Sequence, residues 1–331
     1  MLSPPPRPLA EVTAALASAR PRCVVEASGG ADHTMQIHAG LHALHGARLI
    51  RLDGAPAAPR EAHGVQVRLE GTGRVFFDVR DGPLLYPLAA GVALYAKRSC
   101  PDAAPPNVVP LGLNYPMHPR RVGVLARRWP LLHRALRTPS EPAAVAAALE
   151  PRALFFARTW DPAQAPDEWD IDALNETRAQ CIRALRRRFG KRFLGGFARS
   201  AFALRHFPDA VVPEEFSTRR RDYLRLLRTI PVGVATTGLS GSTGWKFAEY
   251  IALARAVVCE PLRYRASGPM APRRNYLEFA SVDECVERVG QLLEDRAARV
   301  EMMQANEHYW REYGTPAAVV ARVLHTALLR S

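Results

Sequence analysis

Hydrophobic positions in this chain gather in short runs that are separated by longer amphipathic stretches. The short runs have the length of buried strands, about five residues, and stand at 23–27, 48–52, 108–112, 153–157, 193–197 and 232–236. The amphipathic stretches predict helices, at about 33–45, 171–189 and 222–228. Two further runs on either side of Gly71–Gly73 predict a hairpin of 65–69 with 75–79, and the mostly apolar stretch 84–95 predicts another helix.

Strands that alternate with helices favour a parallel sheet with helices on both faces. A length of 331 residues allows two such domains. The stretch from Met117 to Pro151 is rich in Arg, Pro and Ala, and we place the connection between the domains near its end. The sequence therefore predicts an α/β fold of two Rossmann-like domains facing a cleft, an N-terminal one over 1–150 and a C-terminal one over 151–331.

A Gly- and Ser-rich loop at 238–244 is followed by a short helix and by the buried strand that contains Val257 and Val258. Small residues let backbone N–H groups approach a ligand closely, and a helix N-terminus favours an anionic group. Lys246 and Glu249 are three positions apart on this helix, so their side chains are neighbours near the loop. A cation beside a phosphate-binding loop, with a carboxylate that accepts hydrogen bonds from sugar hydroxyl groups, suits a sugar nucleotide.

The segment 246–258 resembles the donor-binding half of GT-B glycosyltransferases, in which a Gly-rich loop precedes a (K/P)xxEYxAxGxxVV pattern. The resemblance continues through 275–279, 281–284, 292–295 and 299–303, and it covers the C-terminal third of the chain but hardly the N-terminal half. One position departs from the pattern. Retaining members of the largest GT-B group carry a glutamate eight residues before the helix glutamate, where this chain has Gly241, so that group's donor contacts and stereochemistry do not carry over whole.

The resemblance implies an enzyme that transfers a sugar from a nucleotide-sugar donor to an acceptor, such as a glycan, a lipid-linked glycan or a small molecule. In such enzymes two basic residues, one after the first strand of the C-terminal domain and one near the start of the next helix, neutralise the leaving diphosphate. Arg158 and Arg178 match these places. The other donor-binding candidates are Ser240, Gly241, Ser242, Thr243, Lys246 and Glu249, of which Glu249 would bind the ribose hydroxyls.

These enzymes use positive side chains and helix ends in place of a metal, so the resemblance implies no metal and no cofactor besides the nucleotide-sugar co-substrate. A plainer interpretation stays open for the same residues. The two arginines would then pair with nearby carboxylates, Glu249 would be a surface carboxylate, and the loop would be a flexible turn.

An inverting transferase needs a general base near the acceptor hydroxyl. Asp32 is our candidate and His33 the next, because both follow the first strand of the N-terminal half, where a loop should face the cleft. A cap for the helix that follows is the interpretation of Asp32 that we favour over the base. The segment Asp78–Asp81 also ends a strand and is a second candidate for the acceptor side. A retaining enzyme would need no such base.

Two patterns that imitate metal sites have simpler explanations. His38, His42 and His45 share a helix face, but no carboxylate or cysteine accompanies them, so we interpret them as a partly exposed face. Asp170 and Asp172 imitate the D-x-D motif of another transferase fold, yet they stand at a predicted helix start, where carboxylates stabilise the helix.

The net charge is +13, with 42 Arg and only three Lys among the basic residues. This charge leaves open a non-catalytic polyanion-binding protein, or another α/β enzyme that acts on phosphorylated metabolites. No nucleic-acid-binding pattern is present, so we expect no specific nucleic-acid partner. The five scattered cysteines indicate buried thiols rather than disulfides.

The beginning of the chain has no apolar signal-peptide core, and no run is long enough to span a membrane. We therefore expect a cytoplasmic protein. The basic stretch 119–137 is a candidate for peripheral contact with an anionic inner membrane face, and a solvated helix with its linker is the alternative.

Overall fold

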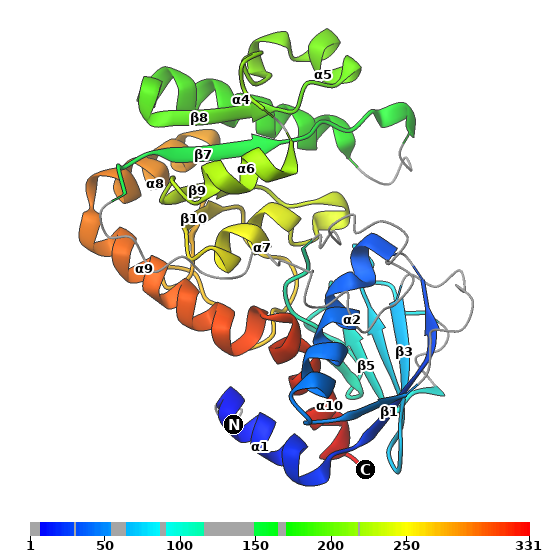
Figure 1. Cartoon of the computed structure of the whole chain (residues 1–331). Coiled ribbons are helices and arrows are strands. Elements are labelled where there is room, and N and C mark those ends of the chain that lie inside the picture. Colours follow the sequence, from blue (N-terminus) through cyan, green and yellow to red (C-terminus); the bar gives the residue numbers. More distant parts are fainter. Residues whose placement is uncertain are drawn as a thin grey trace. The chain divides into compact units, whose positions relative to one another are not determined.

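The computed structural model of the protein describes residues 7–29, 31–53, 64–86, 91–115, 149–164, 170–217 and 219–331. The chain divides into two compact units, whose helices and strands are labelled in Figure 1. Unit 1 consists of Met1–Ser140, Arg263–Met270 and Tyr309–Ser331, and unit 2 of Glu141–Leu262 and Ala271–His308. The predicted division at 150 assigned both C-terminal segments of unit 1 to the second domain, and the structure groups them differently.

Unit 2 contains a five-stranded parallel sheet in the order β11-β10-β9-β7-β8. Its strands are β7 (Ala153–Ala157), β8 (Phe193–Phe197), β9 (Val232–Ala235), β10 (Ala256–Cys259) and β11 (Leu277–Glu278). The chain first adds β8 on one side of β7 and then crosses to add β9 on the other side. The point where the strand order reverses in this way lies between β7 and β9, and ligands of open α/β sheets bind at such points.

Helices cover both faces of this sheet. Successive side chains of a strand point to opposite faces, and all five residues of β7 are buried. Phe155 and its neighbours at every second position pack in one core with α4 (Ile171–Phe189) and α8 (Val282–Glu294). Phe156 points to the opposite face and contacts the ring of Tyr223, which is on α6 (Arg220–Leu227). The remaining helices of this part of the chain are α5 (Ala201–His206), α7 (Trp245–Ala252) and α9 (Arg296–Tyr309).

Unit 1 contains a six-stranded mixed sheet in the order β2-β1-β3-β4-β5-β6. Its strands are β1 (Arg22–Ser28), β2 (Arg51–Asp53), β3 (Gly64–Leu69), β4 (Gly73–Asp78), β5 (Leu94–Lys97) and β6 (Val108–Pro110). The predicted hairpin is confirmed as β3 with β4, and β3 is antiparallel to both of its neighbours. The other five strands run parallel, so β1, β4, β5 and β6 end at one edge of the sheet.

The predicted helix at 84–95 is wrong at both of its described ends. Residues 84–86 and 92–93 are irregular, Leu94 and Tyr95 begin strand β5, and residues 87–90 lie outside the described residues. Every residue of this strand is buried, so its apolar pattern has no period that distinguishes a strand from a helix.

The core of unit 1 is completed by a helix from the C-terminal end of the chain. The helix α10 (Pro316–Leu328) packs on α2 (Ala31–Gly46) and on α1 (Leu9–Ala19). The contact with α2 is close, because a Cβ atom added to Gly40 would lie 2.2 Å from the carbonyl oxygen of Pro316. The π-helix η7 (Trp310–Gly314) connects α9 to α10.

Candidate functional site

The loops after β7 and β9 are held together by one buried side chain of α4. Arg178 donates hydrogen bonds from Nε to Thr236 Oγ1 (2.8 Å), from Nη1 to the carbonyl of Arg158 (2.9 Å) and from Nη2 to the carbonyl of Thr237 (2.9 Å). These three acceptors lie at the carboxyl ends of the two strands that flank the reversal of strand order. Burial lowers the pKa of this guanidinium. Arg178 therefore holds the loops after β7 and β9 in a fixed position relative to each other.

Asn175 stabilises the same loop from the preceding turn of α4. Its Oδ1 accepts from the backbone N–H of Trp160 (3.1 Å), and its Nδ2 donates to the carbonyl of Trp160 (2.7 Å). The path of residues 158–160 is thereby set by two polar side chains of a single helix.

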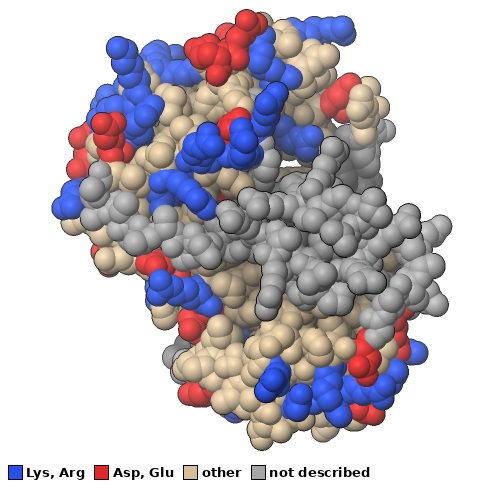
Figure 2. Space-filling view, in the orientation of Figure 1, with Lys and Arg blue, Asp and Glu red and all other residues tan. Residues whose placement is uncertain are grey.

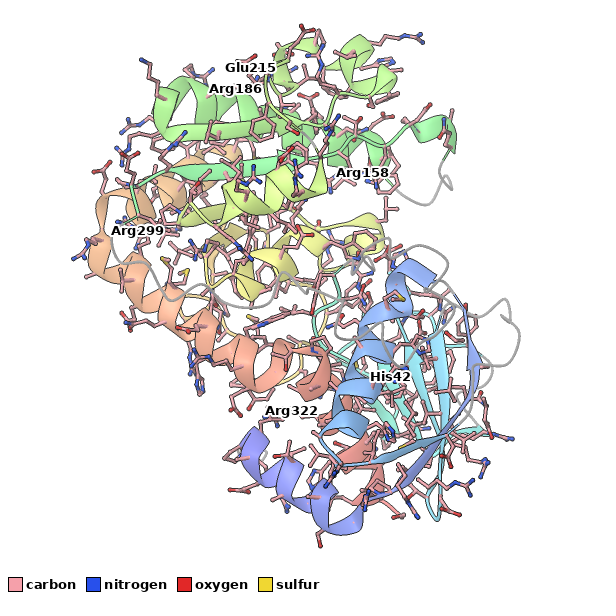
Figure 3. All side chains as sticks on the ribbon, viewed as in Figure 1. His42, Arg158, Arg186, Glu215, Arg299 and Arg322 are labelled. Carbon is pink, nitrogen blue, oxygen red and sulfur yellow. The ribbon has the colours of Figure 1, made fainter. Side chains whose placement is uncertain are left out.

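Arg158 follows β7 directly and is exposed. Figure 3 shows its side chain beyond the carboxyl end of β7. The guanidinium lies 5.0 Å from the ring centroid of Trp160, and it makes no hydrogen bond or ion pair with any described residue. This arginine is positioned to meet an anion, while Arg178 holds its backbone in place.

The Gly- and Ser-rich loop folds back on itself before α7 begins. The N–H of Gly238 donates to the carbonyl of Ser242 (2.7 Å), and Ser240 and Gly241 both have positive φ, 54° and 67°. The N–H groups of Gly241 and Ser242 donate to the carbonyls of Gly238 (3.1 Å) and Leu239 (3.0 Å), so the loop is a closed turn that leads directly into α7. No side chain caps the N-terminus of α7.

Lys246 and Glu249 form an ion pair on α7, with 3.2 Å between Nζ and Oε2. The Glu249 side chain is 1% exposed, whereas that of Lys246 is 32% exposed. The ammonium group also lies 3.6 Å from the ring centroid of Tyr223 and 5.2 Å from that of Phe156. The predicted proximity of Lys246 and Glu249 is confirmed, and the aromatic contacts of the lysine are an addition that the sequence did not show.

One carboxylate near the site was missed in the sequence. Glu260 follows β10, and its Oε2 accepts from both the N–H (2.6 Å) and the hydroxyl (3.0 Å) of Thr237. It thereby fixes the loop after β9 from the other side. A signal was present, since an acidic residue directly after a buried parallel strand belongs at the ligand-binding edge of the sheet.

Comparison with known proteins found similarities among solved structures. No protein-family model and no curated protein sequence matches the chain. Among solved structures, it is similar to the C-terminal domain of LpcC, a glycosyl transferase group 1 family protein from Francisella tularensis, with 11% identity over 53% of this chain and 92% of that chain and a TM-score of 0.37.

Two longer proteins are also similar. TarM from S. aureus, in complex with fondaparinux, α-GlcNAc-glycerol and UDP, has 12% identity over 72% of this chain and a TM-score of 0.44. Alr3699/HepE from Anabaena, in complex with UDP and glucose, has 12% identity over 56% of this chain and a TM-score of 0.37. The present chain spans 45% of the first and 50% of the second.

In unit 1, the predicted base candidates lie in the first turn of α2. Asp32 is inside this helix rather than at its cap, since α2 begins at Ala31, and its side chain lies outside the described residues. His33 is half-buried, and its carbonyl accepts from Asn114 Nδ2 (3.0 Å). Its role as a base, like that of Asp32, stays a prediction.

Asp78 does not line an open acceptor site as we expected. Its carboxylate is fully buried and accepts from the Tyr95 hydroxyl (2.6 Å), while Lys97 Nζ (3.1 Å) and Arg80 Nη2 (2.9 Å) form ion pairs with it. Burial lowers the pKa of Lys97, and the charge of Asp78 opposes this shift. A buried carboxylate with this many partners stabilises the fold.

The patterns that imitate metal sites make separate structural contacts. His38 Nε2 lies 2.8 Å from Ser28 Oγ, and His45 Nδ1 accepts from the N–H of Leu52 (3.2 Å). Asp170 caps α4 by accepting from the N–H of Ala173 (3.1 Å), as predicted. Within the described part of the chain, no three His, Cys, Asp or Glu side chains are grouped for a metal ion.

The remaining expectations concern cysteines and membranes. All five cysteines are free and buried, as predicted. None of the helices in the described ranges is both long and apolar enough to cross a membrane. The basic stretch 119–137 lies outside the described residues.

Proposed function

We propose that this protein is a glycosyltransferase that transfers a sugar from a nucleotide-sugar donor, bound by unit 2, to a glycan or other acceptor. The observation that carries the proposal is the arrangement at the reversal of strand order in unit 2. There, an exposed arginine, a left-handed Gly/Ser loop and the uncapped start of α7 all belong to the carboxyl edge of one parallel sheet.

Each group has a distinct task in this proposal. Arg158 and the N-terminus of α7 bind the diphosphate and stabilise the charge that develops on it as the glycosidic bond breaks. Arg178 positions the two loops, because its nitrogens bind their carbonyl and hydroxyl groups. Glu249 accepts from the ribose hydroxyls, and Lys246 holds its carboxylate in place.

The proposal includes catalysis without a metal, since Arg158 provides positive charge where other transferases use a divalent cation. Activity that survives complete chelation of divalent ions would support this part. Activity that returns only when magnesium or manganese is added would overturn it and leave the transferase proposal standing.

Calorimetry with a panel of nucleoside diphosphates tests the proposed function directly. We expect saturable binding of one of UDP, GDP or ADP, with a clear preference among the bases. Absence of binding to every nucleoside diphosphate would refute the proposal. A polyanion-binding protein would instead show no base preference and a steep, general loss of affinity with salt. Hydrolysis of a phosphoester without sugar transfer would favour the other α/β enzyme class.

The face of unit 2 in Figure 2 bears on the polyanion alternative. Lys and Arg side chains are interspersed there with Asp and Glu. On α6, for example, Asp222 lies between Arg221 (3.5 Å) and Arg225 (3.7 Å) and forms ion pairs with both. Mixed charge of this kind is weaker support for a nucleic-acid-binding surface than a continuous basic stripe would be.

A further inference from the structure

The short segment Arg263–Met270 belongs to unit 1. It contacts the residues that come just after β5 and β6 in the chain. The N–H of Arg265 donates to the carbonyl of Cys100 (2.9 Å), three residues after β5 ends. A Cβ atom on Gly112, two residues after β6, would lie 3.4 Å from the Cβ of Ser267. The hydroxyl of Tyr309 donates to the carbonyl of Ser267 (2.6 Å) and so holds the C-terminal half of this segment.

The acidic groups at this edge of the sheet already have basic partners. Asp78 pairs with Lys97 and Arg80, and Asp81 pairs with Arg98 at 2.6 Å. The Arg98 side chain is buried in this pair. The positive charge of these residues is therefore used within the protein.

Arg263 and Arg265 differ from those residues. Both are exposed, and neither guanidinium makes a hydrogen bond or an ion pair with a described residue. They flank Tyr264, whose pKa is raised chiefly by burial, while the charge of Arg263 opposes this and that of Asp81 adds to it. Two positions apart, their Cα atoms are separated by no more than about 7 Å, so both side chains can reach one small ligand.

A polar group in the loop after β5 is also buried and makes no hydrogen bond with the described residues. Ser99, between Arg98 and Cys100, is 1% exposed, and its hydroxyl has no hydrogen-bond partner among the described residues. A buried hydroxyl without a partner in a folded protein calls for water or a ligand group that is not part of the chain.

We propose that Arg263 and Arg265 bind a phosphate group of the acceptor at the carboxyl edge of the unit 1 sheet. This inference rests on the proposed transferase function. Two arginine forks can each donate two hydrogen bonds to phosphate oxygens, and a phosphate carries enough negative charge to match both. The acceptor is therefore a phosphorylated molecule, either a soluble sugar phosphate or a lipid with a phosphate headgroup.

The test compares three double variants with the wild-type protein. Arg263→Gln/Arg265→Gln removes both charges, and Arg263→Lys/Arg265→Lys keeps the charges but removes the forks. Arg187→Gln/Arg188→Gln is the matched control, because it removes two exposed arginines from α4 of unit 2. The soluble probe is glucose 6-phosphate against glucose, measured by calorimetry with a saturating nucleoside diphosphate present. The lipid probe is sedimentation with phosphatidylglycerol vesicles against phosphatidylcholine vesicles.

We expect wild type and the control to bind one of the two phosphate probes, and the Gln pair to bind it at least about tenfold more weakly. The Lys pair should lie between them. The probe that binds tells whether the phosphate belongs to a soluble molecule or to a lipid. Equal binding by the Gln pair and the control, or binding of neither probe by the wild type, would overturn the inference.

UDP or another nucleoside diphosphate is titrated into the same proteins to separate this inference from the proposed function. Its affinity should be unchanged in the Gln pair, because the altered residues belong to unit 1. Failure of nucleotides to bind the wild type would refute the transferase function. If the Gln pair changes the binding of the phosphate probes but not of the nucleotide, the result concerns the acceptor site alone.

Discussion

Arg178 makes the most informative set of contacts of any single side chain at the donor site. Removing it in Arg178→Met leaves two carbonyl groups and one hydroxyl without their donor. We expect a loss of about 2–4 kcal/mol in the free energy of unfolding, measured with urea, and weaker nucleotide binding. Arg187→Met, at an exposed position of the same helix, should change both quantities little. Equal effects of the two substitutions would contradict the positioning role.

Glu249 and Lys246 allow a second test at the scale of residues. Glu249→Gln keeps the shape of the side chain but removes the charge that pairs with Lys246. We expect nucleotide affinity to fall by about 1–3 kcal/mol, the range for a charge-assisted hydrogen bond, in both Glu249→Gln and Lys246→Ala. Unchanged dissociation constants in two folded variants would remove this pair from the site.

His38 makes stability depend on pH. Burial lowers its pKa to about 4, below the ordinary value of 6.5. The unfolded chain therefore binds a proton at higher pH than the folded one, and the folded state loses stability as pH falls from about 6.5 toward 4. At pH 5 the loss from this group should be about 2 kcal/mol, measured by urea unfolding. His38→Gln should flatten this part of the profile, and an unaltered profile would refute the assignment.

The sequence located the residues of the proposed donor site but did not indicate the contacts that they make. Arg178 was chosen for its place near a helix start, but its contacts reach residues 20 and 59 positions away and follow only from the fold. Glu260 was missed because its partner Thr237 belongs to another strand end. Local pattern therefore locates such residues, and tertiary structure decides what they bind.

The loop between β9 and α7 is the element on which the donor site depends most. A Cβ atom on Gly238 would lie 2.7 Å from Ser242 Oγ, so in Gly238→Ala the Ser242 hydroxyl or the loop itself must shift. We expect nucleotide binding to weaken by about tenfold, since a displaced loop would move the start of α7. Gly290→Ala on α8, where the nearest atom is 3.6 Å away, is the matched control. Calorimetry that gives the same affinity for both variants would show that the loop does not bind the donor.

The helix with the clearest amphipathic period was predicted together with its two ends. The helix at 171–189 has an amphipathic pattern and an aspartate cap, and α4 has the same bounds. The apolar stretch 84–95 had no such period, and β5 occupies only its end, because a strand buried on both faces has the composition of a buried helix. The hairpin of β3 with β4 was predicted from a local pattern, but the antiparallel pairing of β3 with β1 depends on long-range contacts that no local pattern encodes.

At the scale of the whole molecule, unit 1 depends on the contact between α2 and α10. Gly40→Ala would place a methyl group 2.2 Å from the carbonyl of Pro316 and force the helices apart. We expect a loss of about 2–4 kcal/mol in thermal or urea unfolding of unit 1, with nucleotide binding by unit 2 retained. Gly46→Ala, on the same helix with open space around it, should be nearly neutral. A Gly40 variant as stable as the Gly46 variant would disprove this tight packing.

The return of α10 to unit 1 has a consequence for how the protein is made. A ribosome synthesises β1 to β6 first and α10 only after all of unit 2. Until then, the apolar side of α2 that α10 covers has no partner, and exposed apolar surface of this kind favours association with other chains. Unit 2 has all its strands and helices earlier and can fold while synthesis continues. The part of the protein that is translated first is thus the part that finishes folding last.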